Sequence, residues 1–197
     1  MTGVSSIIAT HAHELVCFRR AMHAQPELSG CEYLTTERIL DRLQVEGLAP
    51  VVLGTGTGVI CDIPLETSRT LDPSEVHVVA LRADIDGLAM DDLTDSPFRS
   101  RVPGCAHACG HDVHTAAVLG AGLALLAQRE AHPRAAIVRL IFEPSDETVP
   151  GGAVDVVAEG WLRGVRSVFG VHCDPKLDVG TLGLRTDSLK LFERRFQ

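Results

Sequence analysis

The densest group of potentially reactive side chains lies between residues 107 and 114. This segment, His-Ala-Cys-Gly-His-Asp-Val-His, places one thiol, three imidazoles and a carboxylate close together in the chain. Zinc and similar divalent ions bind nitrogen, sulfur and carboxylate ligands gathered in a small volume. The spacing matches no standard zinc finger. The alternative is an ordinary helix start, capped by Asp112 or Thr115, with the imidazoles in solvent.

Two further groups of candidate ligands follow hydrophobic runs later in the chain. Asp146 and Glu147 come after a run that ends at Phe142, and His172 ends another run. Paired carboxylates suit a site in which one group binds metal and the other accepts a proton from water. Taken singly, the pair could be a solvated acidic loop, and His172 an ordinary core or surface imidazole. Because ligand types at three separate strand ends would face one crevice, we predict that they form one site.

The elements that would position these groups alternate between helices and strands. Helices are predicted over 5–24, Ser29–Gly47, Ala116–Ala127 and Ala153–Glu159, and strands over Pro50–Leu53, Val59–Ile63, Val76–Leu81, Ala135–Phe142, Val165–Val171 and near Val179–Leu184. This alternation predicts an α/β sheet with helices on its faces. In such sheets, ligands bind beyond the carboxyl ends of the strands. The polar segments Arg82–Asp86, Glu143–Glu147 and His172–Asp174 all fall there.

Composition and charge argue against several classes of partner. The chain has 197 residues, of which 45% are hydrophobic, which suits one large globular domain. Its formal net charge of −8 offers no basic surface for phosphates, so nucleic acid is not an expected partner. We find no apolar run that would span a bilayer, no secretory signal, and no disulfide spacing among the six cysteines. We therefore expect a cytoplasmic protein with reduced thiols and no membrane association.

Several segments together resemble the aminoacylase/hippurate-hydrolase branch of the M20 metallopeptidase family, between about Arg19 and about Gly183. They are Arg19–Ser29, Thr57–Val59, Leu81–Leu88 and His107–His114, of which the last is the most specific. The resemblance implies an α/β fold that is part of a zinc-peptidase-like catalytic domain, with a mixed sheet and helices on both faces, over residues 1–185. It also implies that residues 186–197 begin a lid and dimerisation domain. The rest of that domain, and a C-terminal half that supplies a fifth ligand histidine, are expected to be missing.

The resemblance also implies residue roles and a reaction. Cys109, His111, Glu147 and His172 correspond to ligands of a two-metal centre that holds divalent ions such as zinc, manganese, cobalt or nickel. Asp146 corresponds to the general base, which in the family is normally a glutamate. The implied reaction is hydrolysis of the amide bond of a small-molecule N-acyl amino acid.

Three hypotheses follow for this chain. It is an M20 amidohydrolase whose remaining segment lies elsewhere, or an inactive remnant that keeps at most a partial metal site, or a structural zinc domain. The last is the weakest, because structural sites usually gather their ligands locally. The shortened base and the missing ligand predict little amidase activity, and an open sheet edge predicts self-association or a homo-oligomer. Cys109 is predicted to be the reactive thiol, whereas Cys17, Cys31 and Cys61 should be inert when buried.

Overall fold

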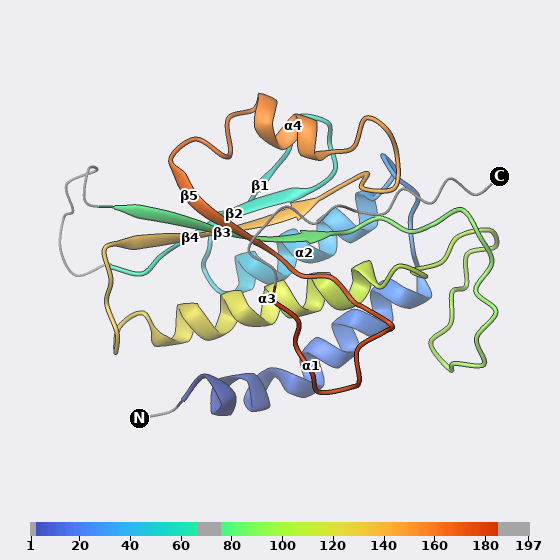
Figure 1. Cartoon of the computed structure of the whole chain (residues 1–197), viewed down its shortest axis with the longest axis horizontal. Coiled ribbons are helices and arrows are strands. Elements are labelled where there is room, and N and C mark those ends of the chain that lie inside the picture. The colour runs from blue at the N-terminus through green and yellow to red at the C-terminus, as the bar shows by residue number, and fades with distance from the viewer. Residues whose placement is uncertain (1–2, 67–75, 185–197) are drawn as a thin grey trace.

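A computed structural model describes residues 3–66 and 76–184 and shows the predicted alternation of helices and strands (Figure 1). The helices are α1 (Val4–Ala24), α2 (Tyr33–Val45), α3 (His111–Gln128) and α4 (Ala153–Ala158). The strands are β1 (Val51–Val52), β2 (Val59–Pro64), β3 (His77–Asp84), β4 (Ala136–Glu143) and β5 (Val165–Gly170). Most of these elements lie within a few residues of the ranges predicted from the sequence.

The strands form one mixed sheet in the order β1-β2-β4-β3-β5. Strand β2 is antiparallel to β1 and β4, whereas β3 is parallel to both β4 and β5. Strands β3, β4 and β5 therefore end at the same edge of the sheet, and Asp84 of β3 stands directly beside Glu143 of β4 in the register. This edge is where the sequence predicted that the polar segments would meet.

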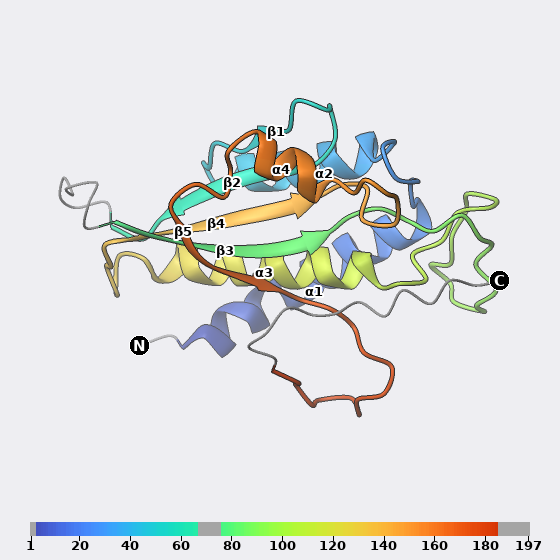
Figure 2. The same cartoon turned by 45° about the horizontal axis from the view of Figure 1, so that its top comes forward.

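Helices cover both faces of the sheet, as the resemblance implied. On one face, α1, α2 and α3 pack in a core that includes Leu43, Leu119 and Phe142. Figure 2 shows α3 and α1 of this layer below the strands. On the other face, Val156 of α4 packs with Ile141 of β4 in a smaller core. The two cores hold the strands between helical layers, so the strand ends are fixed relative to α3.

Helix α3 lies between the sheet and α1, which explains why its sequence has almost no polar face. Val118, Leu119 and Leu123 are almost fully buried in the larger core. The helix begins at His111, so its first turn reaches the edge at which β3, β4 and β5 end. Among the helices of residues 3–66 and 76–184, none has the length and the apolar character that crossing a membrane requires.

The predicted helix start at Ser29 is wrong. Its hydroxyl instead donates a hydrogen bond of 2.7 Å to Asp86, and α2 begins later in the chain. The carboxylate of Glu27 accepts the backbone N–H groups of Leu34 and Thr35 at 3.0 and 2.7 Å. Glu27 thus satisfies two of the amides that the first turn of a helix leaves without a partner. The hydrogen bond from Ser29 to Asp86 instead links the loop before α2 to the segment that follows β3.

The strand predicted near Val179–Leu184 is also wrong. This segment forms a turn followed by irregular structure, and β5 is the last strand within the described residues. Strand β5 therefore lies at one edge of the sheet as described. The predicted start of a further domain at 186–197 lies outside the described residues.

Candidate metal centre

Three of the predicted metal ligands come together where the strands end. Cys109, His111 and Glu147 each offer one donor atom, and these atoms lie within 4.8 Å of one another. His111 Nε2 is 3.4 Å from Glu147 Oε1. Cys109 and His111 precede and begin α3, whereas Glu147 follows β4, so the group depends on the packing of α3 against the sheet.

The fourth predicted ligand, His172, approaches the group from the segment after β5. Its Nε2 lies 3.7 Å from the Sγ atom of Cys109. Its Nδ1 lies 2.7 Å from the carbonyl oxygen of Cys173, which can only accept a hydrogen bond. The hydrogen of a neutral His172 ring therefore sits on Nδ1, and Nε2 keeps its lone pair.

The environment of His111 fits a bound cation. Its Nδ1 lies 2.9 Å from a carboxylate oxygen of Asp86, so the ring donates from that side. Its Nε2 is buried and has no hydrogen-bond partner, although a buried polar atom without a partner costs free energy. A metal ion bonded to Nε2 would satisfy this atom. A thiolate, two imidazoles and a carboxylate also form a donor set that suits zinc and related ions.

Asp86, just after β3, orients two of the predicted ligands at once. One of its carboxylate oxygens accepts the hydrogen bond from His111, and the other accepts the backbone N–H of Glu147 at 3.0 Å and the hydroxyl of Ser29 at 2.7 Å. Burial raises the pKa of Asp86, but these hydrogen bonds outweigh burial and hold it below the usual range. A carboxylate that fixes the ring of a metal-binding histidine is common around metal ions. The sequence pattern places Asp86 at the strand end but indicates no role for it.

The negative groups around His111 also favour positive charge at its ring. Burial lowers the pKa of His111, but the hydrogen bond with Asp86 and the charges of Asp84 and Cys109 raise it to about 11. The same groups would favour a metal cation in place of the second ring proton, because both carry positive charge.

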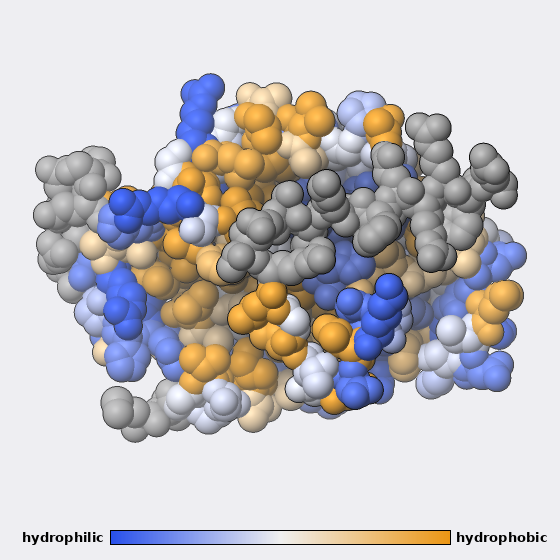
Figure 3. Space-filling model, viewed as in Figure 1, coloured by the Kyte–Doolittle hydropathy of each residue, from blue (hydrophilic) through white to orange (hydrophobic). Residues whose placement is uncertain are grey.

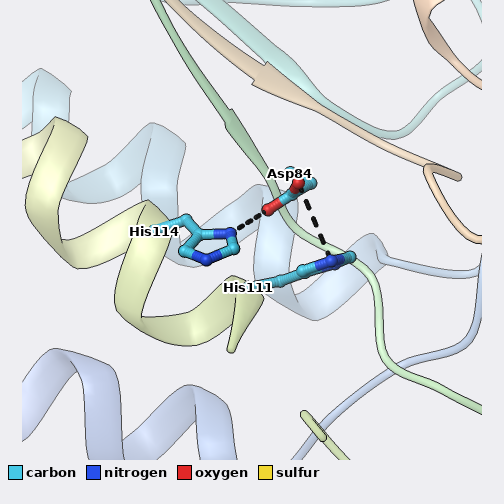
Figure 4. A group of neighbouring side chains, drawn as sticks. All are labelled: Asp84, His111 and His114. Atoms are coloured by element: carbon cyan, nitrogen blue, oxygen red, sulfur yellow. Dashed lines mark hydrogen bonds and ion pairs between the residues drawn. The ribbon is translucent and has the colours of Figure 1, made fainter. Parts of the chain in front are cut away.

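A second group of possible donors consists of Asp84, His111 and His114 and shares His111 with the first (Figure 4). His114 Nδ1 is 2.6 Å from one oxygen of Asp84, and His111 Nε2 is 3.7 Å from the other. Burial raises the pKa of Asp84, but the hydrogen bond from His114 and nearby positive charges lower it to about 2. Asp84 therefore remains ionised, and all three side chains are buried.

Asp146, the predicted general base, does not belong to either group. Its carboxylate pairs with the guanidinium group of Arg82 on β3. Arg82 also bonds Asp84 and Glu143, at 2.7 and 2.8 Å. The carboxylate of Asp146 is therefore held by a cation of the protein, and its role as a base stays a prediction.

The alternative of a simple capped helix start is wrong. Gly110 occupies the N-cap position of α3 and provides no side-chain cap, while His111 is buried instead of solvated. Asp112 pairs with Arg19 at 2.6 Å, and the hydroxyl of Thr115 donates to a carbonyl oxygen at the end of β3. The polar residues of this turn therefore bind groups on other elements and do not cap their own helix.

Comparison with known proteins confirms the resemblance inferred from the sequence segments. A sequence profile of Peptidase family M20/M25/M40 matches residues 80–188, more than half of the chain. The chain is 42% identical over 186 residues to an N-acetylcysteine deacetylase of Bacillus subtilis, and this match covers 93% of the chain and 46% of the relative. It is also 47% identical over 173 residues to a putative glutamate–cysteine ligase 2-3 of Rhodococcus jostii, of which the match covers 20%.

A solved structure of similar fold shows the same partial coverage. The crystal structure of the Bacillus subtilis YXEP protein, described as a dinuclear metal binding peptidase from the M20 family, superposes with a TM-score of 0.79 at 38% identity. The match covers 90% of this chain and 47% of that protein. The chain thus spans less than half the length of these relatives, which agrees with a partial catalytic domain.

Proposed function

The chain belongs to peptidase family M20/M25/M40, and we propose that it carries the metal-binding part of an amidohydrolase that cleaves the amide bond of N-acyl amino acids. Relatives named N-acetylcysteine deacetylase and N-acyl-L-amino acid amidohydrolase support this substrate class. The observation that carries the proposal is the buried Nε2 atom of His111, which lacks a hydrogen-bond partner and lies among the donors of Cys109 and Glu147.

We assign Cys109, His111, Glu147 and His172 as the residues that hold divalent metal. The solved relative described as dinuclear supports two ions for the full family site. Zinc, manganese, cobalt and nickel are all candidates, since each accepts imidazole ligands. When bound, such ions polarise a carbonyl group and lower the pKa of water.

Two further residues have roles in the proposed reaction, one in orienting the ligands and one in proton transfer. Asp86 orients the ring of His111 and holds the backbone of Glu147. We assign Asp146 to accept the proton of the attacking water and to return it to the amine that leaves. For this role its carboxylate must separate from Arg82, with which it now pairs.

The pairing of Asp146 with Arg82 favours a second candidate function, metal binding without catalysis. An aspartate is one methylene shorter than the glutamate that is usual in the family, and catalytic rates are sensitive to displacements of about 1 Å. A base that is both short and paired with a cation would accept a proton poorly. In this case the chain would keep the metal site and lack turnover.

Metal binding and hydrolysis, measured separately on the purified 197-residue chain, test both candidates. Competition with a chelator should show Co²⁺ binding, and Cys109→Ala or His111→Ala should weaken it by at least about tenfold. The matched control, His132→Ala, alters an exposed histidine and should leave affinity unchanged. Binding without release of amino acid from N-acetylcysteine would support the second candidate. If the wild-type chain bound Co²⁺ no better than Cys109→Ala, the metal site itself would be wrong.

A further inference from the structure

His114 lies in the histidine-rich segment 107–114, close to the possible metal ligands Asp84 and His111. Both of its ring nitrogens nevertheless already have hydrogen-bond partners. Its Nδ1 is 2.6 Å from Asp84 Oδ1, and its Nε2 is 2.7 Å from the backbone nitrogen of Cys173. The ring is fully buried. His114 therefore has no free donor to offer to a metal ion.

The partners of His114 define its tautomer. A backbone N–H can only donate, so Nε2 of His114 must accept the hydrogen bond from Cys173. The hydrogen of the ring then sits on Nδ1 and is donated to Asp84, whose other oxygen accepts a hydrogen bond of 2.7 Å from Arg82. The ring is thus a neutral bridge between a buried carboxylate and a backbone amide.

That amide belongs to the segment that carries His172. The last ladder contact of this chain segment with β3 is a long hydrogen bond of 3.4 Å from Val171 to Arg82. One residue beyond His172, the N–H of Cys173 bonds His114, and the carbonyl of Cys173 accepts the hydrogen bond from the ring of His172. The backbone of Cys173 is thus held on one side and orients His172 on the other.

The orientation of His172 is the one that metal binding needs. With its hydrogen on Nδ1, the ring turns the lone pair of Nε2 toward Cys109 Sγ, 3.7 Å away. The rings of His114 and His172 also lie close, with their centres 4.8 Å apart. His172 is exposed to solvent, so its own packing gives little restraint. The hydrogen bond from Cys173 to the buried His114 supplies the restraint that packing does not.

We propose that His114 is a positioning residue, which bonds the amide of Cys173 and so presents Nε2 of His172 to a metal ion, and that it is not a metal ligand. This inference rests on the proposed function, because it takes His172 as a ligand. The arrangement extends from Arg82 through Asp84 and His114 to the backbone that carries His172. A partner of this kind is expected to alter metal affinity by about 10- to 100-fold.

Two substitutions separate the two hydrogen bonds of His114. In His114→Gln the side-chain amide oxygen can occupy the place of Nε2 and still accept the N–H of Cys173. In His114→Asn the shorter amide can still donate to Asp84 but leaves the N–H of Cys173 without a partner. We expect His114→Asn to weaken Co²⁺ binding by about 10- to 100-fold and His114→Gln by less than about threefold.

A double-mutant cycle shows whether His114 acts through His172. In the His172→Ala chain the ligand is already lost, so adding His114→Asn should produce no further change in Co²⁺ affinity. An equal loss in both backgrounds would overturn the proposal, since His114 would then act on another ligand or on folding in general. Equal weakening by His114→Asn and His114→Gln would overturn it as well, because the Cys173 hydrogen bond would then be irrelevant.

Measurements on the metal-free chain keep this test separate from the proposed function. Nitrogen-15 NMR should find His114 neutral with its hydrogen on Nδ1, and the amide of Cys173 should be protected from exchange in the wild type and in His114→Gln but not in His114→Asn. A hydrogen on Nε2, or an unprotected Cys173 amide in the wild type, would overturn the proposal with or without metal. Protection that depends on His114, in a wild-type chain that binds no Co²⁺, would support the positioning role and overturn the metal function.

Discussion

Asp146 and Glu147 are adjacent in the sequence, but their carboxylates have different partners. Glu147 Oε1 lies 3.4 Å from His111 Nε2, whereas Asp146 pairs with Arg82. Arg82 also bonds Glu143 at 2.8 Å, so its charge would keep a partner if the carboxylate at position 146 moved away. A side chain longer by one methylene could therefore reach toward the metal donors without leaving Arg82 unpaired.

The substitution Asp146→Glu is expected to increase hydrolysis of N-acetylcysteine by the metal-loaded chain. The gain could reach about 100-fold, because a misplacement of about 1 Å can cost that much in rate. Release of the free amino group measures the effect, and Asp146→Asn should show no turnover above that of the metal alone. Asp41→Glu, an exposed site on α2, is the control and should change nothing. If Asp146→Glu hydrolysed the substrate no faster than the wild type, the length of the side chain at position 146 would not be what limits the rate.

The six cysteines differ in exposure and in acidity, and all of them are free thiols in the structure. Cys17 and Cys31 were expected to be inert when buried. Both are exposed, so this expectation does not apply to them. Cys61 is 1% exposed, and burial together with the charge of Asp62 raises its pKa to about 11. At pH 8 the thiol of Cys61 therefore stays both protonated and shielded.

Alkylation of the native chain at pH 8 should follow these environments. Cys17 and Cys31 should react readily, and Cys61 should react only after denaturation, because the thiolate is the reactive species. Cys109 should react in the metal-free chain and be protected when Zn²⁺ is added. Mass spectrometry of the peptides, with a fully denatured sample as the control, measures each site. Labelling of Cys109 that does not respond to Zn²⁺ would argue that this thiol binds no metal.

Part of the site could be predicted from residue types alone. Cys109, His111 and Glu147 are metal-ligand types at the expected carboxyl ends of strands or next to α3, and the structure brings them together. The roles of Asp86 and His114 could not be predicted in this way. Their partners include a distant hydroxyl and backbone amides, which any sequence offers in large numbers, so only the folded geometry selects them.

The parallel direction of three strands explains why the candidate ligands that follow separate strands come together. Strands β3, β4 and β5 run in one direction, so the residues that follow them meet at one edge. The strand predicted near Val179–Leu184 failed for a related reason. A segment with apolar residues forms a strand only where a neighbouring strand pairs with its backbone hydrogen-bonding groups. Within the described residues this segment has no such neighbour.

The turn between β1 and β2 packs directly against the segment after β4. Gly58 has a φ of +84°, and a Cβ atom there would lie 2.6 Å from Pro144 and 3.0 Å from both Leu53 and a backbone oxygen of Phe142. Pro144 closely precedes Asp146 and the candidate ligand Glu147. A glycine at position 58 is therefore required both by the backbone conformation and by the close approach of the two segments.

The substitution Gly58→Ala should lower the free energy of unfolding by about 1–3 kcal/mol more than Gly104→Ala does, because it adds overpacking to conformational strain. Gly104 is the matched control, since its φ is +72° and a Cβ atom there would have no neighbour within 4 Å. Urea unfolding followed by circular dichroism measures both variants. An equal decrease in the free energy of unfolding for both variants would indicate that the turn can move away from Pro144 without a loss of stability.

Within the described residues, β5 is the least covered strand of the sheet. This strand lies at the edge, next to β3, and most of its residues are exposed. Val168 is 50% exposed and Phe169 58% exposed, and successive residues of a strand point to opposite faces. Hydrophobic side chains gather across this side of the molecule (Figure 3). An edge strand with apolar side chains on both faces is a common site of pairing between chains.

We therefore expect the 197-residue chain to associate with itself through β5. The substitution Phe169→Lys should shift the chain toward the monomer, because a charge on an edge strand opposes pairing with a second strand. Sedimentation velocity across a range of protein concentrations measures the shift. Leu93→Lys is the matched control, since Leu93 is 90% exposed but lies in a loop outside the sheet, so its loss should leave association unchanged. Equal effects of the two substitutions would indicate nonspecific attraction between apolar side chains, and a wild-type chain that stays monomeric at every concentration would rule out association through β5.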